Sequence, residues 1–172
     1  MPKMNVILVD YENVQVNLDI LRSVNIEDLE IYIFIGKNQK NIPVELADNI
    51  LKLKSKVQLI RIEGTGKDAL DFHIAYFIGK LSKENENYFF HIISKDTGFD
   101  VLIEYLKKEK IKCLREEKIE EVPIIKKNEA IPITKKLKAE TILQKAKIFK
   151  EILEKSSNKP KKEKALISQM IT

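Results

Sequence analysis

The sequence predicts an α/β domain built on a parallel sheet with helices on both faces. Five short apolar runs each have the length of one buried strand, and segments with apolar residues at helical spacing separate them. Such alternation with short connections is typical of a parallel sheet covered by crossover helices. The 172 residues suit one domain of this kind with a small appendage.

The five expected strands are short runs rich in apolar residues, and the first two have the continuous pattern of strands buried on both faces. The first is the run from Val6 to Val9, and Gly36 ends the second. The strands are expected at residues 6–9, 30–35, 57–62, 88–93 and 111–114.

Four helices are expected between these strands, and the first of them has the weakest pattern. Pro43 begins the second, where a proline costs little because its missing N–H would have no partner inside the helix. In the third, Leu70, Ile74 and Ile78 share one face. The helices are expected at residues 14–22, 43–54, 69–81 and 98–108.

The C-terminal part of the chain is expected to form a separate basic segment. Pro123 and Pro132 bracket a predicted linker, and a lysine-rich amphipathic helix and one further helix follow it. The predicted division is a domain at 1–122, a linker at 123–133 and a basic helical segment at 134–172, with helices at 134–155 and 161–171.

Charge separates the two ends of the chain. Residues 1–122 carry 18 Lys and Arg against 21 Asp and Glu, whereas residues 123–172 carry 13 Lys against 5 Glu. A basic tail beside a mildly acidic domain favours a polyanion partner, with nucleic acid first, although a generally lysine-rich surface would look the same. The tail residues expected to contact nucleic acid are Lys135, Lys136, Lys138, Lys161 and Lys162.

The single cysteine, Cys113, allows no disulfide within the chain, so a reducing cytoplasm is the expected location. No apolar run approaches the roughly 20 residues that span a bilayer, and the first residues have the pattern of a core strand rather than of a signal peptide. We therefore expect no membrane partner.

Acidic residues follow the expected strands or begin the helices next to them. Asp10 ends the first strand, Asp96 comes shortly after the fourth, and Asp100 lies in the first turn of the next helix. Asp68 and Asp71 begin the helix that leads into the fourth strand. Because parallel strands end at the same edge of a sheet, we expect all five carboxylates along one rim.

An Asp at a helix start also caps free N–H groups, and this reading stays open for Asp68, Asp96 and Asp100. Asp71 is harder to explain in this way, because it lies inside an otherwise apolar helix where a carboxylate must be paired or bound to metal. Several carboxylates on one rim repel one another, and a cation would offset that repulsion. Oxygen ligands favour Mg²⁺ or Mn²⁺, and the two histidines and one cysteine offer no zinc set.

Three blocks of sequence carry a family resemblance. The segments VDYENV at 9–14, ALDFHIAYFIG at 69–79 and FHIISKDTGFDVLIEYLK at 90–107 resemble the PIN-like superfamily, and they are most similar to a bacterial branch close to the NYN nucleases. The resemblance covers residues 4–115. It implies a three-layer α/β/α fold with sheet order 3-2-1-4-5 and metal-dependent cleavage of RNA.

The resemblance also implies roles for residues in the matching blocks. The catalytic and metal-binding residues it implies are Asp10, Asp71, Asp96 and Asp100. The secondary candidates are Asn13, Asp68, Lys95 and Thr97. Asn13 would be the polar partner in the turn after the first strand. In the reaction we expect, Lys95 would contact phosphate, although a solvated lysine explains it equally well, and the N–H groups of Thr97 and Gly98 would form an anion seat at a helix start.

The expected function is that of a metal-dependent endoribonuclease acting on single-stranded or structured RNA, with a homodimer as a possible assembly. The alternative is a catalytically weak PIN-like protein that binds RNA or serves as a scaffold, in which Asn at Asp10 or Asp71 would leave function intact. A tail that binds a partner helix is compatible with both. A phosphate-accepting receiver domain is disfavoured, because the third strand ends without an Asp.

Several other residues are expected to be structural. His73, His91 and Cys113 adjoin or lie in apolar runs and are interpreted as packed or hydrogen-bonded core residues. Four aromatic residues are interpreted as core rather than as platforms for nucleic-acid bases. They are Tyr11, Phe72, Tyr76 and Phe99. The segment EGTGKDA at 63–69 lacks the glycine and hydroxyl positions of a phosphate loop.

Overall fold

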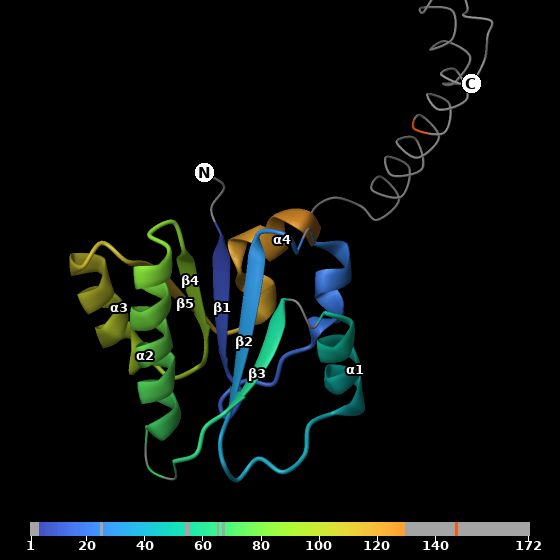
Figure 1. Cartoon of the computed structure of the whole chain (residues 1–172), viewed down its shortest axis with the longest axis horizontal. Helices are drawn as coiled ribbons and strands as arrows, with labels where there is room; N and C mark the ends of the chain where they lie inside the picture. The colour runs from blue at the N-terminus through green and yellow to red at the C-terminus, as the bar shows by residue number, and fades with distance from the viewer. Residues whose placement is uncertain are drawn as a thin grey trace, which may run out of the picture. The chain divides into compact units, whose positions relative to one another are not determined.

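A five-stranded, fully parallel sheet lies at the centre of the domain in the computed structural model (Figure 1). Its order is β3-β2-β1-β4-β5, so the α/β fold class and the expected strand order are confirmed. The strands are β1 (Asn5–Asp10), β2 (Leu29–Ile35), β3 (Val57–Arg61), β4 (Phe89–Ile93) and β5 (Lys112–Glu116).

The structure describes residues 4–24, 26–53, 56–64, 66, 68–129 and 147. The chain divides into two units, Met1–Ala130 and Ile131–Thr172, and the fold described below is that of the first. Within the second unit, the described residue is Lys147. The predicted helices at 134–155 and 161–171 and the tail lysines proposed to bind nucleic acid therefore lie outside the described residues.

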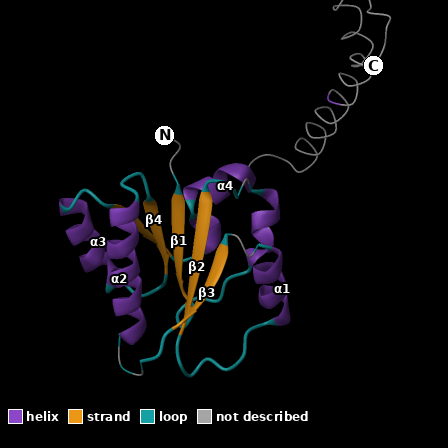
Figure 2. Ribbon diagram, in the orientation of Figure 1, coloured by secondary structure: helices purple, strands orange, loops and turns teal. Residues whose placement is uncertain are grey.

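Helices cover both faces of the sheet (Figures 1 and 2). One face carries α2 (Ala69–Glu84) and α3 (Phe99–Lys108), and the other carries α1 (Val44–Lys52) and α4 (Pro123–Glu129). Two short 3₁₀ helices complete the described elements, η1 (Leu18–Ser23) and η2 (Ile119–Glu121). No helix among the described residues is long and apolar enough to cross a membrane.

Alternation along β1 decides which face each side chain joins. Val6 and Leu8 pack in the core under α2 and α3, whereas Ile7 and Val9 pack in the core under α1 and α4. All four are fully buried, as expected of a central strand covered on both faces. Asp10 has the same parity as Val6 and Leu8, so the strand directs its carboxylate to the face that carries α2.

The helix expected at 14–22 was wrong in both type and extent. The structure has an extended stretch followed by the 3₁₀ helix η1, which begins only after Asn17. The Asn17 side chain accepts a hydrogen bond from the Asp19 backbone N–H at 2.9 Å and so fixes the later start. Val14 and Val16, two residues apart, are both buried, which is the period of an extended chain rather than of a helix.

The linker expected at 123–133 begins instead with helix α4. Pro123 occupies the first helical position, where proline fits a helix and does not end it. Val122 and Ile125 are fully buried in the core under α1 and α4. The domain therefore extends beyond residue 122, because helix α4 packs on this face of the sheet.

The residues interpreted as structural divide into two groups. His73 Nδ1 donates a hydrogen bond to the Ala69 carbonyl, His91 is fully buried between Glu116 and Asn5, and Cys113 is buried, so these three expectations are confirmed. Tyr11 and Phe99 are buried in the core. Phe72 and Tyr76, in contrast, are exposed on α2, and their interpretation as core residues was wrong.

Candidate metal centre

Asp10 is a buried carboxylate held by donors from two segments. Only 1% of the residue is exposed. Its Oδ2 accepts hydrogen bonds from Ser94 Oγ at 2.7 Å and from Asn13 Nδ2 at 2.6 Å, and its Oδ1 accepts from the Asn13 backbone N–H at 3.3 Å. A buried charge is tolerated only when it is bonded in this way. The site therefore begins with one carboxylate of fixed position.

Asp71 lies half-buried in the first turn of α2, and its pKa is raised to about 6. Burial is the largest cause, and the negative charges of Asp10, Asp96, Asp68 and Glu12 follow in that order. These neighbours come from β1, from the loop after β4 and from the start of α2. Carboxylates from separate segments thus crowd Asp71 strongly enough to oppose its ionisation.

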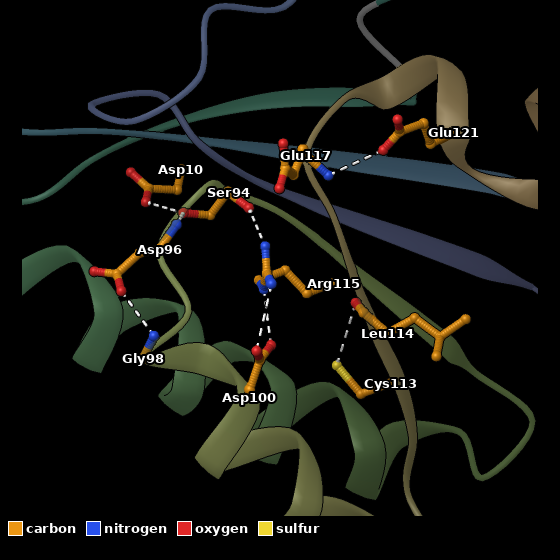
Figure 3. A network of polar contacts seen from close by, with 10 residues as sticks. All are labelled: Asp10, Ser94, Asp96, Gly98, Asp100, Cys113, Leu114, Arg115, Glu117 and Glu121. Atoms are coloured by element: carbon orange, nitrogen blue, oxygen red, sulfur yellow. Dashed lines mark hydrogen bonds and ion pairs between the residues drawn. The ribbon is translucent and has the colours of Figure 1, made fainter.

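Asp96 belongs to this crowd and also bonds the turn before the next helix. Its Oδ1 accepts a hydrogen bond from the Gly98 N–H at 2.7 Å, and its own backbone N–H donates to Ser94 Oγ at 3.0 Å. One carboxylate oxygen of Asp96 is therefore engaged in this turn, while Gly98 rather than Asp96 is the N-cap residue of α3. The fully buried Ser94 ties the two acids together, because its hydroxyl donates to Asp10 and accepts from Asp96 (Figure 3).

Asp100 is placed differently from the other acids. Arg115 Nε donates to Asp100 Oδ1 at 2.8 Å, and a second Arg115 nitrogen contacts Oδ2 at 3.3 Å. The hydrogen bond from Arg115 holds the pKa of Asp100 below its ordinary value. Arg115 also donates to the Ser94 carbonyl at 3.1 Å, so its guanidinium stands between Ser94 and Asp100 in Figure 3. The structure brings Asp10, Asp71 and Asp96 together, whereas it pairs Asp100 with the guanidinium of Arg115.

Asp68 precedes α2 in the left-handed backbone region, with φ of 63°. Aspartate enters this region more readily than most residues. Its side chain makes no capping hydrogen bond to the helix, so the capping interpretation is not supported for Asp68. Together with Asp71 and Asp96 it lines a hollow of about 530 Å³ between α2 and α3, whose apolar wall includes Phe72.

The remaining predicted residues lie around this edge. Asn13 bonds Asp10 as described, and the exposed Lys95 lines a second hollow together with Asn13 and Lys118. Thr97 and Gly98 are exposed at the start of α3, but the Gly98 N–H already bonds Asp96. The Gly98 N–H, which was expected to form part of an anion seat, is therefore already hydrogen-bonded to Asp96.

Three contributors to the site were missed by sequence reasoning. Ser94 and Arg115 act through partners far along the chain, and a motif cannot reveal such pairs. Glu12 could have been found, because it stands in the acidic turn DYEN right after Asp10. Its carboxylate lies over Gly36 at the end of β2, where a Cβ would overlap it.

The donor set fits a hard divalent cation. As the side chains stand, no three His, Cys, Asp or Glu in the described part of the chain are grouped closely enough to surround one ion. Asp10, Asp71 and Asp96 nevertheless offer only oxygen, and their mutual repulsion raises the pKa of Asp71. Mg²⁺ is usually held by one or two carboxylates and several waters, which a loose cluster of this kind can supply.

A parallel sheet in this order, with carboxylates at its carboxyl edge, defines an α/β domain whose candidate binding site lies at that edge. Residues 4–116 match the family model of the PIN domain, and the chain belongs to that family. PIN domains are generally nucleases that need divalent metal and act on RNA. No curated protein and no solved structure matches the chain.

Proposed function

We propose that this protein is a ribonuclease that uses Mg²⁺ or Mn²⁺ held by Asp10, Asp71 and Asp96. The observation that carries the proposal is the meeting of three carboxylates at one edge of the sheet: Ser94 bonds both Asp10 and Asp96, and Asp71 lines the same hollow as Asp96. A fold does not need to gather charges of one sign, and doing so costs stability. A bound cation offsets this cost, so the arrangement favours a metal centre over a set of helix caps.

Each residue of the proposed centre has a distinct task. Asp10 is the rigid ligand, because Ser94 and Asn13 hold its carboxylate in place. Asp71 is the ligand whose ionisation the bound cation favours. Asp96 aims at the same hollow from the loop before α3. A divalent cation held by these three carboxylates would act as a Lewis acid that makes a bound water more acidic and offsets negative charge on the phosphodiester oxygens.

Asp100 and Arg115 form the variable part of the proposed centre. Asp100 was predicted as a fourth metal ligand, and we keep that role as a proposal. It requires the carboxylate to leave Arg115, which would then present its guanidinium to a phosphate oxygen. Lys95 and Thr97 are proposed to contact the RNA, and Asp68 is proposed to lie beside the RNA strand as it enters the site.

The proposed substrate is single-stranded or structured RNA, cleaved at internal phosphodiesters. The net charge of +8 over residues 123–172 supports this assignment, because lysines add affinity for phosphate that is independent of sequence. The tail contacts proposed are Lys135, Lys136, Lys138, Lys161 and Lys162. A place in the NYN branch, a cytoplasmic location and a homodimer complete the proposal.

Cleavage of a labelled single-stranded RNA by the purified full chain tests this function. We expect products with Mn²⁺ and none with EDTA, and Asn at Asp10 or Asp71 should lower the rate by about 10²-fold or more. Asp48→Asn is the matched control, because Asp48 lies on α1 and pairs with Lys52. Equal degradation by all variants would identify a contaminant and contradict the proposal.

A scaffold or RNA-binding protein with little activity is the second candidate. The engagement of Asp100 by Arg115 and of one Asp96 oxygen by Gly98 favours it, because both interactions occupy predicted metal ligands. This candidate predicts that the wild-type chain binds RNA without cleaving it in any metal. It also predicts that Asp71→Asn binds RNA at least as tightly as wild type.

A further inference from the structure

Two large aromatic side chains stand in solvent on α2. Phe72 is 72% exposed and Tyr76 is 65% exposed. They are four residues apart and therefore adjacent on the helix surface. The helix does not need either of them for packing, because Leu70, Ile74 and Ile78 already fill its buried face. Phe77 shows the contrast, since it packs against Tyr32 and Phe34 of the sheet.

The exposed aromatics adjoin the candidate metal centre. Phe72 directly follows Asp71 in the chain and lines the same hollow as Asp71 and Asp96. At 3.6 residues per turn, Phe72, Tyr76 and Lys83 lie within about 60° of one another around the helix axis and extend for about 16 Å along it. A Cβ at Gly79, which lies between Tyr76 and Lys83 on this stripe, would meet nothing within 4 Å.

We propose that Phe72 and Tyr76 form a stacking platform for the bases of a single-stranded RNA whose phosphate lies at the metal centre. The inference rests on the proposed ribonuclease function and names the substrate class it selects. Aromatic faces stack on any base, so the platform accepts single strands without regard to sequence, and paired bases do not reach it. Lys83 meets the phosphates where the strand leaves the platform.

The position of the stripe favours an RNA strand over a second copy of the chain. A protein surface packed on Phe72 would also cover the hollow that Asp71 and Asp96 line, and it would keep substrate from the metal centre. A single RNA strand can use both features together, because its phosphates would lie at the metal centre while its bases stack on the aromatic rings.

Comparison of a normal RNA with an abasic one isolates stacking from all phosphate contacts. The full chain is titrated, in Ca²⁺ and with strand integrity checked afterwards, into a short labelled RNA and into the same strand lacking bases at its central positions. We expect wild type to bind the normal strand about tenfold more tightly. Phe72→Ala should remove this preference, and Phe72→Trp should keep it.

Val44→Ala is the matched control, because Val44 is an exposed apolar residue of α1 on the opposite face of the sheet. It should keep the tenfold preference. The inference is overturned if wild type binds both strands equally, or if Phe72→Ala keeps the preference. It is also overturned if Phe72→Ala changes only the mass of the chain in sedimentation, which would identify the stripe as a contact between copies.

The metal-dependent cleavage assay separates this inference from the function on which it rests. A chain that discriminates between the two strands but cleaves neither in Mn²⁺ supports the platform and contradicts the ribonuclease. A chain that cleaves in Mn²⁺ without discriminating does the reverse.

Discussion

At the scale of single residues, the site combines a carboxylate that is fully satisfied with one that is crowded. Asp10 is buried and bonded by Ser94 and Asn13, so its position does not depend on a bound ion. Asp71 instead faces the negative charges of Asp10 and Asp96. This contrast gives the site a fixed ligand beside one whose ionised form a cation would favour.

The crowding of Asp71 should appear as a pH dependence of stability in EDTA. Its pKa is about 6 in the folded chain against an ordinary value of 3.8, so the folded state holds this proton to higher pH than the unfolded state. Wild type should therefore lose stability relative to Asp71→Asn as the pH rises from about 4 to about 6. Because solvent screens this half-buried group, we expect about 1 kcal/mol.

Urea unfolding of both chains between pH 3 and pH 8 measures this difference. The curves should lie closest near pH 3, where Asp71 is mostly protonated in both states, and separate by pH 7. Asp48→Asn serves as the control, since Asp48 pairs with Lys52 on the outside of α1. Curves for wild type and Asp71→Asn that stay parallel over the whole range would show that the carboxylates do not crowd one another.

At the scale of elements, the strands were predictable and several helical segments were not. Apolar runs located all five strands to within two residues at each end. The three central strands are covered on both faces, whereas the edge strands β3 and β5 keep several exposed residues. The helix α4 was missed because Pro123 reads equally well as a linker residue or as the first residue of a helix. Tertiary packing decides between these, and the sequence does not display it.

The exposed aromatics of α2 were misread for a related reason. The helix has apolar residues on several faces, so periodicity alone does not say which face meets the sheet. The sheet takes Ile74 and Ile78 and leaves Phe72 and Tyr76 in solvent. The proposed stacking platform rests on this exposed apolar face, which only the packed structure identifies.

Helix α4 should contribute measurably to the stability of the domain. Ile125 is fully buried in the core under α1 and α4. Ile125→Ala should lower the free energy of unfolding by about 2–4 kcal/mol, because it leaves a cavity there. The exposed neighbour Lys126, changed to Ala, should alter it by about 0.5 kcal/mol or less.

Urea denaturation of the full chain gives both values. If Ile125→Ala costs no more than Lys126→Ala, helix α4 is not part of the cooperative domain. The boundary near residue 122 that the sequence predicted would then be the better description.

At the scale of the whole molecule, topology explains why acids far apart in sequence meet. The order β3-β2-β1-β4-β5 places β1 beside β4, so Asp10 at the end of one and Asp96 after the other reach the same edge. Helix α2 begins at that edge and adds Asp71. The rule that parallel strands end at one edge predicted this meeting before any side chain was placed.

The partners of each acid were beyond that rule. Arg115 and Asp100 are 15 positions apart, and Ser94 and Asp10 are 84 apart. Such pairs depend on side-chain rotamers and on strand register, to which a sequence motif gives no access. The edge of the sheet at which the acids meet was therefore predictable, whereas the pairing of Asp100 with Arg115 was not.

The account as a whole depends on a divalent cation binding where Asp10, Asp71 and Asp96 converge, and calorimetric titration of the full chain with Mn²⁺ tests this most directly. We predict saturable binding by wild type, at least about tenfold weaker binding by Asp71→Asn, and unchanged binding by Asp48→Asn. A wild-type chain that takes up no Mn²⁺, or an Asp71→Asn chain that binds it as tightly as wild type, would contradict the account.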